Sequence, residues 1–297
     1  MNSLQNNTSA SSKKIRSNVP LAEFTTFGIG GPAAYFCEVH TLEDLQEALR
    51  FVNERSLPLY VLGKGSNSLF DDHGYAGLVL YNRIDFLERL EENRLRVGSG
   101  FSFSRLGTLA AREGLSGLEF ASGIPGSVGG AVFMNAGANG RETCQALESV
   151  EFLDRNGTLK RAALSELEMS YRHSRFHKEY AVIYSATFAL QKDASARERQ
   201  LEILAKRKSS QPLQEKSAGC VFRNPEGGYS GALIEQCGLK GKRIGGAVVS
   251  EKHSNFIVNG GGATAQDVLN LAKFIQESVL EKTGMRLQME VRYVPYE

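Results

Sequence analysis

Apolar residues recur at helical spacing in two well-marked segments of the chain. The apolar residues of 42–52 fall on one helix face, and Thr41 with Asp44 forms a capping pair directly before them. Residues 264–283 repeat this arrangement, and Gly284 provides a stop signal. The pattern therefore predicts one helix early in the chain and a longer one close to its end.

Shorter apolar runs lie before, between and after these two helices and predict strands. The expected strands cover residues 32–39, 58–62, 77–81, 95–98, 150–154, 158–161, 182–190, 253–259 and 287–294, with further helices over 104–113 and 193–208. Helices and strands mix along the whole chain, so we expect an α+β protein. Its expected parts are a disordered tail at 1–18, two small units at 19–84 and 85–192, a connecting helix at 193–208 and a final unit at 209–297.

The composition is that of a soluble globular protein. The chain has 297 residues, a net charge of +2 and 41% hydrophobic residues, which gives no reason to expect nucleic acid or a membrane as a partner. No apolar run approaches the about 18 residues that cross a bilayer, and residues 1–18 lack the apolar core of a signal peptide. The 4 cysteines are widely spaced, which predicts reduced thiols in the cytoplasm and no zinc site.

Glycine is the unusual residue, because many of the 31 glycines gather in short runs. Gly28 to Ala33 matches the loose dinucleotide pattern G-x-G-x-x-A, but no hydrophobic strand precedes it, so we expect a plain turn. Gly63 to Asn67, which reads Gly-Lys-Gly-Ser-Asn, does follow a predicted strand. Its backbone N–H groups and the Ser66 hydroxyl are able to hold a pyrophosphate, and the alternative is an ordinary turn at a strand end.

The longest glycine-rich run, Ser122 to Gly137, contains almost no charge. A bare loop of this length exposes backbone groups that are costly to desolvate unless something bonds to them. A flat cofactor with polar edges would satisfy those groups, and the alternative is a buried structural crossover. The run is therefore a candidate cofactor loop.

Five segments, taken in order, resemble the UDP-N-acetylenolpyruvoylglucosamine reductase (MurB) family. They are Gly63 to Asn67, Ser122 to Gly137, Tyr171 to Phe176 (Tyr-Arg-His-Ser-Arg-Phe), Ala218 to Pro225 (Ala-Gly-Cys-Val-Phe-Arg-Asn-Pro) and Leu287 to Arg292 (Leu-Gln-Met-Glu-Val-Arg). The resemblance implies an FAD-binding domain of the vanillyl-alcohol-oxidase (PCMH) type in two subdomains. An α/β substrate-binding domain follows, and its last strand returns to the flavin site. The chain resembles the shorter form of the family, which lacks an extra Tyr-bearing loop over the substrate.

The resemblance also implies an activity and a cofactor. FAD, bound non-covalently, takes hydride from NADPH and reduces the enolpyruvyl ether of UDP-N-acetylglucosamine to UDP-N-acetylmuramate, a precursor of peptidoglycan. The residues that the resemblance places at FAD are Gly63, Lys64, Gly65, Ser66, Asn67, Ser122, Gly123, Ile124, Pro125, Gly126, Gly129, Gly130, Asn135 and Gly137. Those that it places at the UDP-sugar are Lys208, Asn224 and His253.

Three further residues carry the chemistry that the resemblance implies. Arg172 faces the substrate carboxylate, where negative charge builds up; alone, it would be a surface charge in a basic run. Glu290 shares that site in protonated form, with an exposed glutamate paired to Arg292 as the alternative. Cys220 stands where the family has Ser or Cys and delivers the second proton as a thiol, whereas an arbitrary cysteine is a small buried hydrophobe.

Other interpretations of the same residues stay open at this point. His173 and His177 have the i, i+4 spacing of a metal pair but no third ligand nearby, so we expect a solvated basic patch and no metal. The fold also suits another PCMH-type flavin oxidase. A non-catalytic regulator that binds flavin or UDP-sugar is the remaining alternative, and no protein partner is implied.

Overall fold

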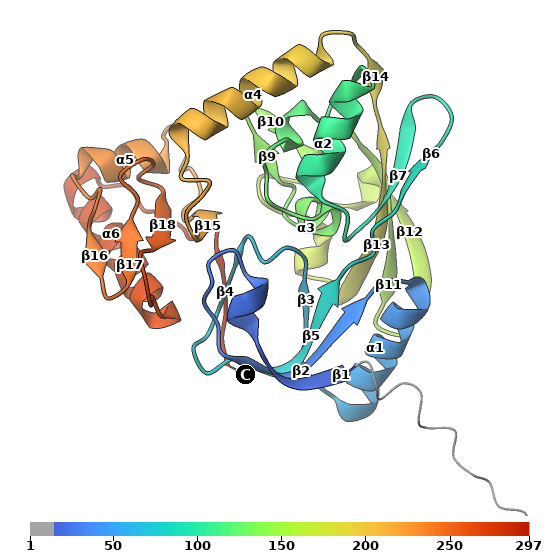
Figure 1. Cartoon of the computed structure of the whole chain (residues 1–297), viewed down its shortest axis with the longest axis horizontal. Coiled ribbons are helices and arrows are strands. Elements are labelled where there is room, and N and C mark those ends of the chain that lie inside the picture. Colours follow the sequence, from blue (N-terminus) through green and yellow to red (C-terminus); the bar gives the residue numbers. More distant parts are fainter. Residues whose placement is uncertain (1–14, 297) are drawn as a thin grey trace, which may run out of the picture.

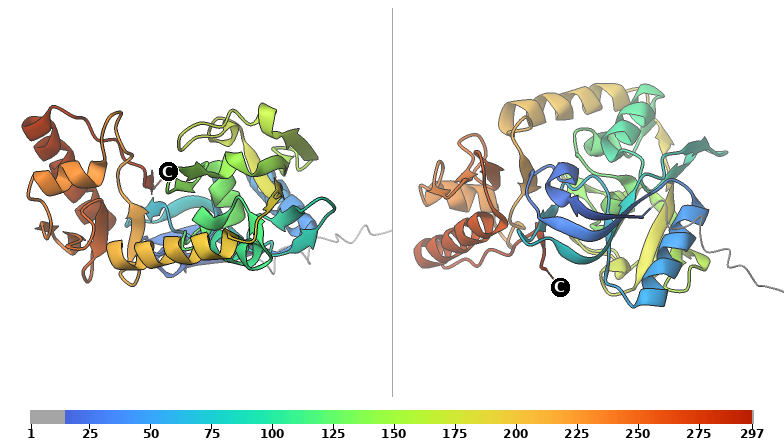
Figure 2. Two further views of the ribbon diagram at one scale, coloured as in Figure 1. Left: turned by 90° about the horizontal axis from the view of Figure 1, so that it is seen from above. Right: turned by 60° about the horizontal axis from the view of Figure 1, so that its bottom comes forward.

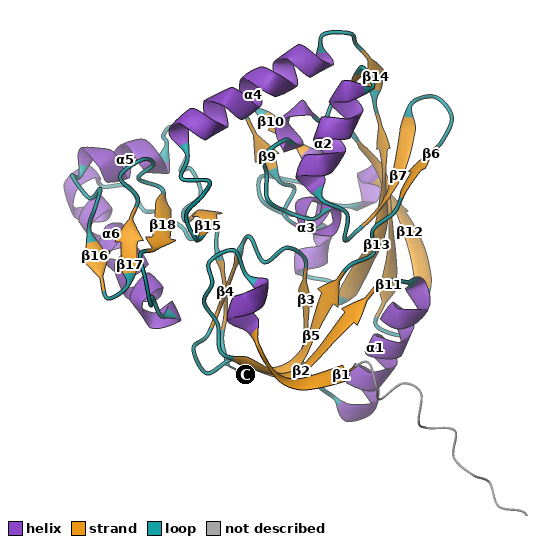
Figure 3. Cartoon of the chain, viewed as in Figure 1, coloured by secondary structure: helices purple, strands orange, loops and turns teal. Residues whose placement is uncertain are grey.

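The structure is a computed structural model that describes residues 15–296. Its helices and strands form an N-terminal, a central and a C-terminal group (Figure 1, Figure 3). The N-terminal and central groups lie against each other, and the C-terminal group lies to one side of them (Figure 2). Helix α4 (Ala196–Ser210) spans the distance from the central group to the C-terminal group.

The N-terminal group is a four-stranded sheet with one covering helix. Its strand order is β1 (Ile15–Pro20), β2 (Pro32–Val39), β5 (Tyr75–Asn82) and β3 (Leu59–Leu62). Helix α1 (Leu42–Arg55) begins at the expected capping box of Thr41 and Asp44 and buries Leu45, Ala48, Leu49 and Val52 against this sheet. The glycine run at 28–33 is a turn that leads into β2, as expected.

The expected tail at 1–18 is wrong for its last four residues. Residues 15–18 belong to β1, which pairs antiparallel with β2. The sequence did not predict this strand because its residues are mostly polar. The strand forms by pairing with β2, which lies later in the chain. The rest of the expected tail lies outside the described residues.

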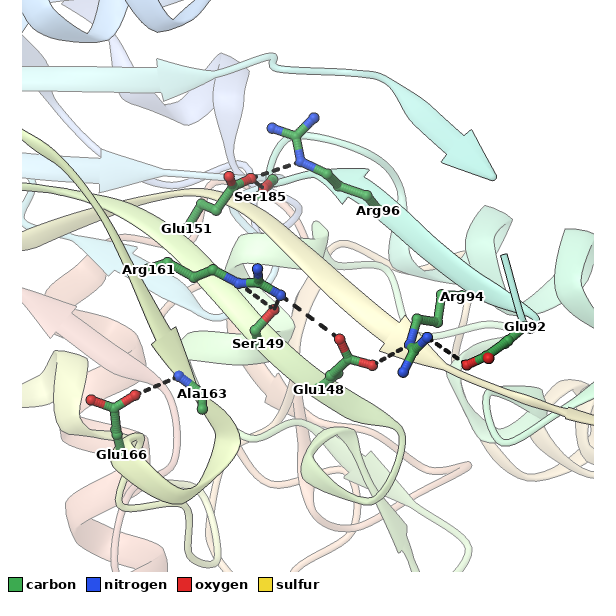
Figure 4. A network of polar contacts seen from close by, with 10 residues as sticks. All are labelled: Glu92, Arg94, Arg96, Glu148, Ser149, Glu151, Arg161, Ala163, Glu166 and Ser185. Atoms are coloured by element: carbon green, nitrogen blue, oxygen red, sulfur yellow. Dashed lines mark hydrogen bonds and ion pairs between the residues drawn. The ribbon is translucent and has the colours of Figure 1, made fainter. Parts of the chain in front are cut away.

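The central group is an antiparallel five-stranded sheet. Its strand order is β12 (Leu159–Ala163), β11 (Leu147–Asp154), β13 (Ala181–Ala189), β7 (Arg94–Gly98) and β6 (Leu87–Arg89). Apolar side chains of the sheet pack in one core with helices α2 (Phe103–Arg112) and α3 (Val128–Phe133). Alternate residues carry cross-strand ion pairs, such as Arg96 with Glu151 at 2.7 Å (Figure 4). The side chains of this pair are about a quarter exposed, so the pair is partly shielded from solvent.

Helix α3 interrupts the segment that the sequence predicted as one long loop, 122–140. A helix was not expected in a segment rich in glycine, which disfavours helices. Neighbouring backbone holds it instead: Ser127 caps it, and its first two N–H groups donate to the carbonyls of Phe101 and Ser99 at 2.9 and 2.8 Å. Tertiary contacts therefore override the local preference.

The C-terminal group is a second antiparallel sheet flanked by helices. Its strand order is β15 (Ser217–Cys220), β18 (Phe256–Asn259), β17 (Ala247–Val249) and β16 (Arg243–Ile244), and its helices are α5 (Ser230–Gln236) and α6 (Ala265–Thr283). Helix α6 has the expected capping box and ends at Gly284, whose φ is 72°. Its buried face shares a core with Phe27 and Leu69 of the N-terminal group, so the two groups are packed together.

The chain end returns to the N-terminal group. Strand β19 (Arg292–Val294) pairs parallel with β4 (Ser68–Phe70), directly after the Gly63 to Asn67 loop. The predicted final strand at 287–294 is thus too long, and Glu290 precedes the strand. This return brings the loop and Glu290 together: the Asn67 amide donates to the Glu290 carbonyl at 3.2 Å.

Short elements complete the fold. They are the 3-10 helices η2 (Leu21–Phe24), η3 (Glu119–Ala121), η4 (Thr143–Gln145), η5 (Leu164–Glu166) and η6 (Arg175–His177), and strands β8 (Leu115–Ser116), β9 (Gly137–Ala138), β10 (Arg141–Glu142) and β14 (Gln191–Lys192). Within residues 15–296, no helix combines the length and the apolar character that crossing a membrane requires.

Candidate active site and its family

Two of the glycine loops predicted from the sequence lie against each other. A side chain at Gly63 would collide with the Ser127 hydroxyl, and a Cβ at Gly126 would lie 3.9 Å from Ser66 Oγ. Strand β3 delivers the first loop, and the N-terminus of α3 ends the second. The fold therefore joins segments 63–67 and 122–127 into one surface, which we call the glycine cradle.

Backbone donors line the first half of the glycine cradle. Over residues 63–67, no backbone N–H donates to an acceptor in the described chain. The loop packs closely against residues 24–26, because the Gly65 carbonyl accepts from the Thr26 N–H at 3.2 Å and a Cβ on Gly65 would collide with the Phe24 carbonyl. Half-buried N–H groups that lack an internal acceptor fit an anionic ligand such as a pyrophosphate.

The second half contains both accessible and fully internal residues. Gly123 has a φ of +85°, and its N–H donates to Ser104 Oγ at 2.7 Å. In contrast, Asn135 is fully buried, and its amide donates to Glu142 and to the Ser170 carbonyl, both at 3.0 Å. Both N–H bonds of that amide are used inside the protein. The structure therefore places Asn135 as a support of the site's wall.

Three other predicted residues, Gly129, Gly130 and Gly137, lie outside the glycine cradle. A Cβ at Gly129 would lie 3.0 Å from the Ser99 side chain, and one at Gly137 would meet the Arg141 carbonyl. Gly130 donates its N–H to Ser127 Oγ at 3.2 Å. Close packing against the protein itself explains why positions 129 and 137 require glycine, without a contact to a cofactor.

Arg172 and Glu290 form a half-buried ion pair beside the cradle. Arg172 Nε lies 2.6 Å from Glu290 Oε1, and the side chains are only 16% and 15% exposed. A second guanidinium nitrogen donates to the Gly137 carbonyl at 3.2 Å. Arg172 holds this position with a left-handed backbone, φ 56°, which is uncommon for a residue with a side chain and frequent at functional sites.

Cys220 lies at the end of β15, where its thiol senses both members of this pair. Burial, together with the charge of Glu290, raises the pKa of Cys220 to about 12, although Arg172 and Arg207 oppose that rise. Burial likewise raises the pKa of Glu290, against the opposing effect of Arg172. The Glu290 N–H donates to the carbonyl of Val221, the residue after Cys220, at 2.7 Å. The structure therefore brings Arg172, Cys220 and Glu290 together, with the thiol held in its protonated form at neutral pH.

The three residues predicted at the UDP-sugar share no hydrogen bond with one another in the described chain, but their immediate neighbours connect them. Lys252, which precedes His253, contacts Lys208. The His253 ring lies 3.3 Å from a Cβ placed on Gly231, next to Ser230. Asn224 accepts the Ser230 N–H at 3.1 Å and so anchors the start of α5. His253 is half-buried, with its ring 4.9 Å from that of Phe256. Lys208 is exposed, and its backbone carbonyl accepts from the Lys252 ammonium at 2.6 Å.

The sequence missed Arg207, one position before Lys208 on α4. A Cβ at Gly123 would lie 3.1 Å from Arg207 Nε, so the guanidinium lies directly against the glycine cradle. One residue changes the direction of a helical side chain by about 100°, and helix α4 has no clear apolar face by which the sequence could fix that direction. The only local signal is the run of basic residues at 206–208.

The expected solvated patch at His173 and His177 is wrong. Both rings are half-buried and stacked 4.9 Å apart, and His177 lies 4.1 Å from the Phe133 ring. Burial, together with the nearby cations of Arg292 and Arg223, lowers the pKa of His177 to about 4. His177 is therefore a neutral packing residue beside the site.

Comparison with known proteins assigns the chain to a family. A model of an FAD binding domain matches residues 33–163, and a model of the C-terminal domain of UDP-N-acetylenolpyruvoylglucosamine reductase matches residues 211–294. The reductase of that name from Protochlamydia amoebophila is 57% identical over 95% of this chain and 94% of its own length. This chain belongs to the UDP-N-acetylenolpyruvoylglucosamine reductase family.

Other members of the family agree in sequence and in structure. The Chlamydia felis reductase is 49% identical over 95% of both chains. The crystal structure of the Thermus caldophilus enzyme (MurB) has a TM-score of 0.81 and 38% identity, and it covers 95% of this chain and all of that one. The chain is thus an FAD-containing oxidoreductase with the α+β fold expected from its sequence. Neither the oxidase nor the regulator alternative is favoured.

Proposed function

We propose that this enzyme reduces the enolpyruvyl ether of UDP-N-acetylglucosamine to UDP-N-acetylmuramate, with NADPH as reductant, and so serves peptidoglycan synthesis. Family membership supports the reaction. The observation that carries the assignment of residues is the cluster of Arg172, Cys220 and Glu290 next to the glycine cradle. The four cysteines are free thiols, and we place the reaction in the cytoplasm, where thiols stay reduced.

We assign FAD to the glycine cradle, because its free N–H donors and missing side chains suit a pyrophosphate and a flat ring. The chemistry that bound FAD supplies is two-electron hydride transfer, from NADPH to the terminal carbon of the enolpyruvyl group. Residues 19–192 would bind FAD, and residues 209–297 would bind most of the sugar nucleotide. Lys208, Asn224 and His253 remain candidates for contacts with the UDP-sugar.

Arg172 and Glu290 would bind the substrate carboxylate. Negative charge grows there during the reduction, and a fixed guanidinium stabilises such charge strongly in a site that excludes water. A protonated Glu290 would donate a hydrogen bond to the same group. The raised pKa of Glu290 suits that role, because a second carboxylate beside it raises the pKa further.

Cys220 would complete the reaction by giving its proton to the α-carbon. A pKa of about 12 keeps the thiol protonated at neutral pH, which is the state that a proton donor must have. The nearby Arg172 and Arg207 stabilise the thiolate that remains. Solvent then restores the proton.

The test of this function is a spectroscopic titration of the purified enzyme. We expect a yellow protein whose flavin absorbance is bleached by NADPH and restored by UDP-N-acetylglucosamine enolpyruvate, with UDP-N-acetylmuramate as product. A protein that reoxidises only with oxygen would contradict the proposed substrate. A protein that binds the sugar nucleotide without consuming NADPH would contradict the proposed activity.

A further inference from the structure

Helix α4 turns two arginines toward the central group, and only one of them has a counter-charge. Arg199 pairs with Glu119 at 2.7 Å and with Asp193 at 2.8 Å. Arg207 has no ion pair in the described chain, and its buried Nε has no hydrogen-bond partner. Burial lowers the pKa of Arg207, and the one group that opposes this is the Cys220 thiol.

A buried guanidinium N–H without a partner, such as the Nε of Arg207, carries a desolvation cost unless a ligand supplies the missing acceptor. Arg207 is well placed for such a ligand. Leu204 and Arg207, which are three residues apart on one face of α4, both touch the position where Gly123 would carry a Cβ, at 3.2 and 3.1 Å. Gly123 thus leaves room for the guanidinium next to the cradle.

Gln211, four residues after Arg207, also has a buried atom without a partner, its carbonyl Oε1. Its backbone N–H donates to the Arg207 carbonyl at 2.9 Å, so the two residues lie one turn apart at the C-terminal end of helix α4. Together they offer a charged donor and a neutral acceptor. The carbonyl-bearing edge of an isoalloxazine ring alternates acceptors with an N–H donor and matches that pair.

We propose that Arg207 faces the isoalloxazine ring of FAD and stabilises the negative charge that the ring gains on reduction. Its position favours the ring over the pyrophosphate of FAD. Arg207 lies against Gly123 and near enough to Cys220 to lower the pKa of that thiol. Cys220 belongs to the reacting centre where the ring must lie, whereas the free N–H groups of 63–67 suit the pyrophosphate. Arg172 already serves the substrate carboxylate, which leaves the flavin as the anion for Arg207. This inference rests on the proposed function.

The test is the midpoint potential of bound FAD, measured on the holoenzyme without sugar nucleotide. The variants are Arg207→Met, which removes the charge, and Arg207→Lys, which keeps it. Lys206→Met is the matched control, because Lys206 is the exposed neighbour on the same helix. Dye-coupled reduction gives the potential from absorbance alone and does not depend on turnover.

We expect Arg207→Met to weaken the binding of reduced FAD, relative to oxidised FAD, at least tenfold. For a two-electron couple this is a fall in potential of about 30 mV. The midpoint potential should fall less in Arg207→Lys, and in Lys206→Met it should match that of the wild type. If Arg207→Met fails to fold, the potential of Arg207→Lys against the control still decides.

Three results would overturn the proposal. An unchanged potential with weaker binding of FAD in both redox states would place Arg207 at the pyrophosphate. An unchanged potential with a raised KM for the enolpyruvyl sugar would place it at the substrate. A fall of equal size in Lys206→Met would show a general charge effect. A wild-type protein without FAD, or one that NADPH does not reduce, would instead contradict the proposed function itself.

Discussion

The glycine cradle offers backbone N–H groups and open space, whereas the neighbouring cluster of Arg172, Cys220 and Glu290 acts through buried side chains. In the cradle, position 65 requires glycine because a Cβ would collide with the Phe24 carbonyl, and charge plays no part in that requirement. In the cluster, burial and charge together determine which groups carry protons. The two regions meet at Asn67, whose amide holds the Glu290 backbone.

This difference predicts two kinds of sensitivity. A site made of backbone is damaged by added volume and tolerates changes of pH. A site made of buried ionisable groups is sensitive to pH and to substitutions that remove a titratable proton, even when they keep the shape. Added side-chain volume is therefore the best test of the glycine cradle, and a change of protonation is the best test of the cluster.

The largest effect on stability should come from Gly65→Ala. Its φ of +63° and the Phe24 carbonyl both exclude a Cβ, so we expect a loss of about 2–4 kcal/mol in the free energy of unfolding and purification without FAD. Gly140→Ala is the matched control, since its φ is +75° and nothing lies within 4 Å of the added Cβ. That variant should lose about 1 kcal/mol and keep FAD. Equal losses of stability and of FAD in the two variants would contradict the claim that the cradle depends on the space that Gly65 leaves open.

A smaller effect, about tenfold in kcat, is expected from Glu290→Gln, which keeps the shape and a hydrogen-bond donor. Because burial raises the pKa of Glu290, its contribution to wild-type stability is greatest below the ordinary carboxyl pKa and is lost as pH rises through the raised value. The same rise removes the proton that the site needs. The variant should lack both declines, as seen in denaturant unfolding and in pH profiles of kcat/KM.

Glu281→Gln is the control for that experiment, because Glu281 is exposed on α6. Its stability and its pH profile should match those of the wild type. An alkaline decline in activity that persists unchanged in Glu290→Gln would show that another group titrates. In that case Glu290 would not be the acid beside the substrate carboxylate.

The sequence predicted those parts of the fold that local signals determine. Helices α1 and α6 carry capping boxes and apolar faces, and both begin where expected. Strand β1 and helix α3 were missed, because the first depends on pairing with β2 and the second on the Phe101 and Ser99 carbonyls. Such partners lie outside any local window.

The candidate site divides in the same way. Arg172, Cys220 and Glu290 come from segments far apart in the chain, and only the resemblance to a family linked them before the structure did. Arg207 has no motif, and a sequence does not show which side chain of α4 faces inward without a partner. Asn135 carries a motif position, yet its buried amide supports the wall of the site.

The central claim, that Cys220 is the proton donor of the cluster, is tested most directly by stopped-flow measurement of both half-reactions in Cys220→Ala. We predict flavin reduction by NADPH within about twofold of the wild type and reoxidation by the enolpyruvyl sugar slower by about 10²–10⁴-fold. Cys220→Ser, which keeps a proton donor, should recover most of that loss. Reoxidation at the wild-type rate in Cys220→Ala would contradict the account.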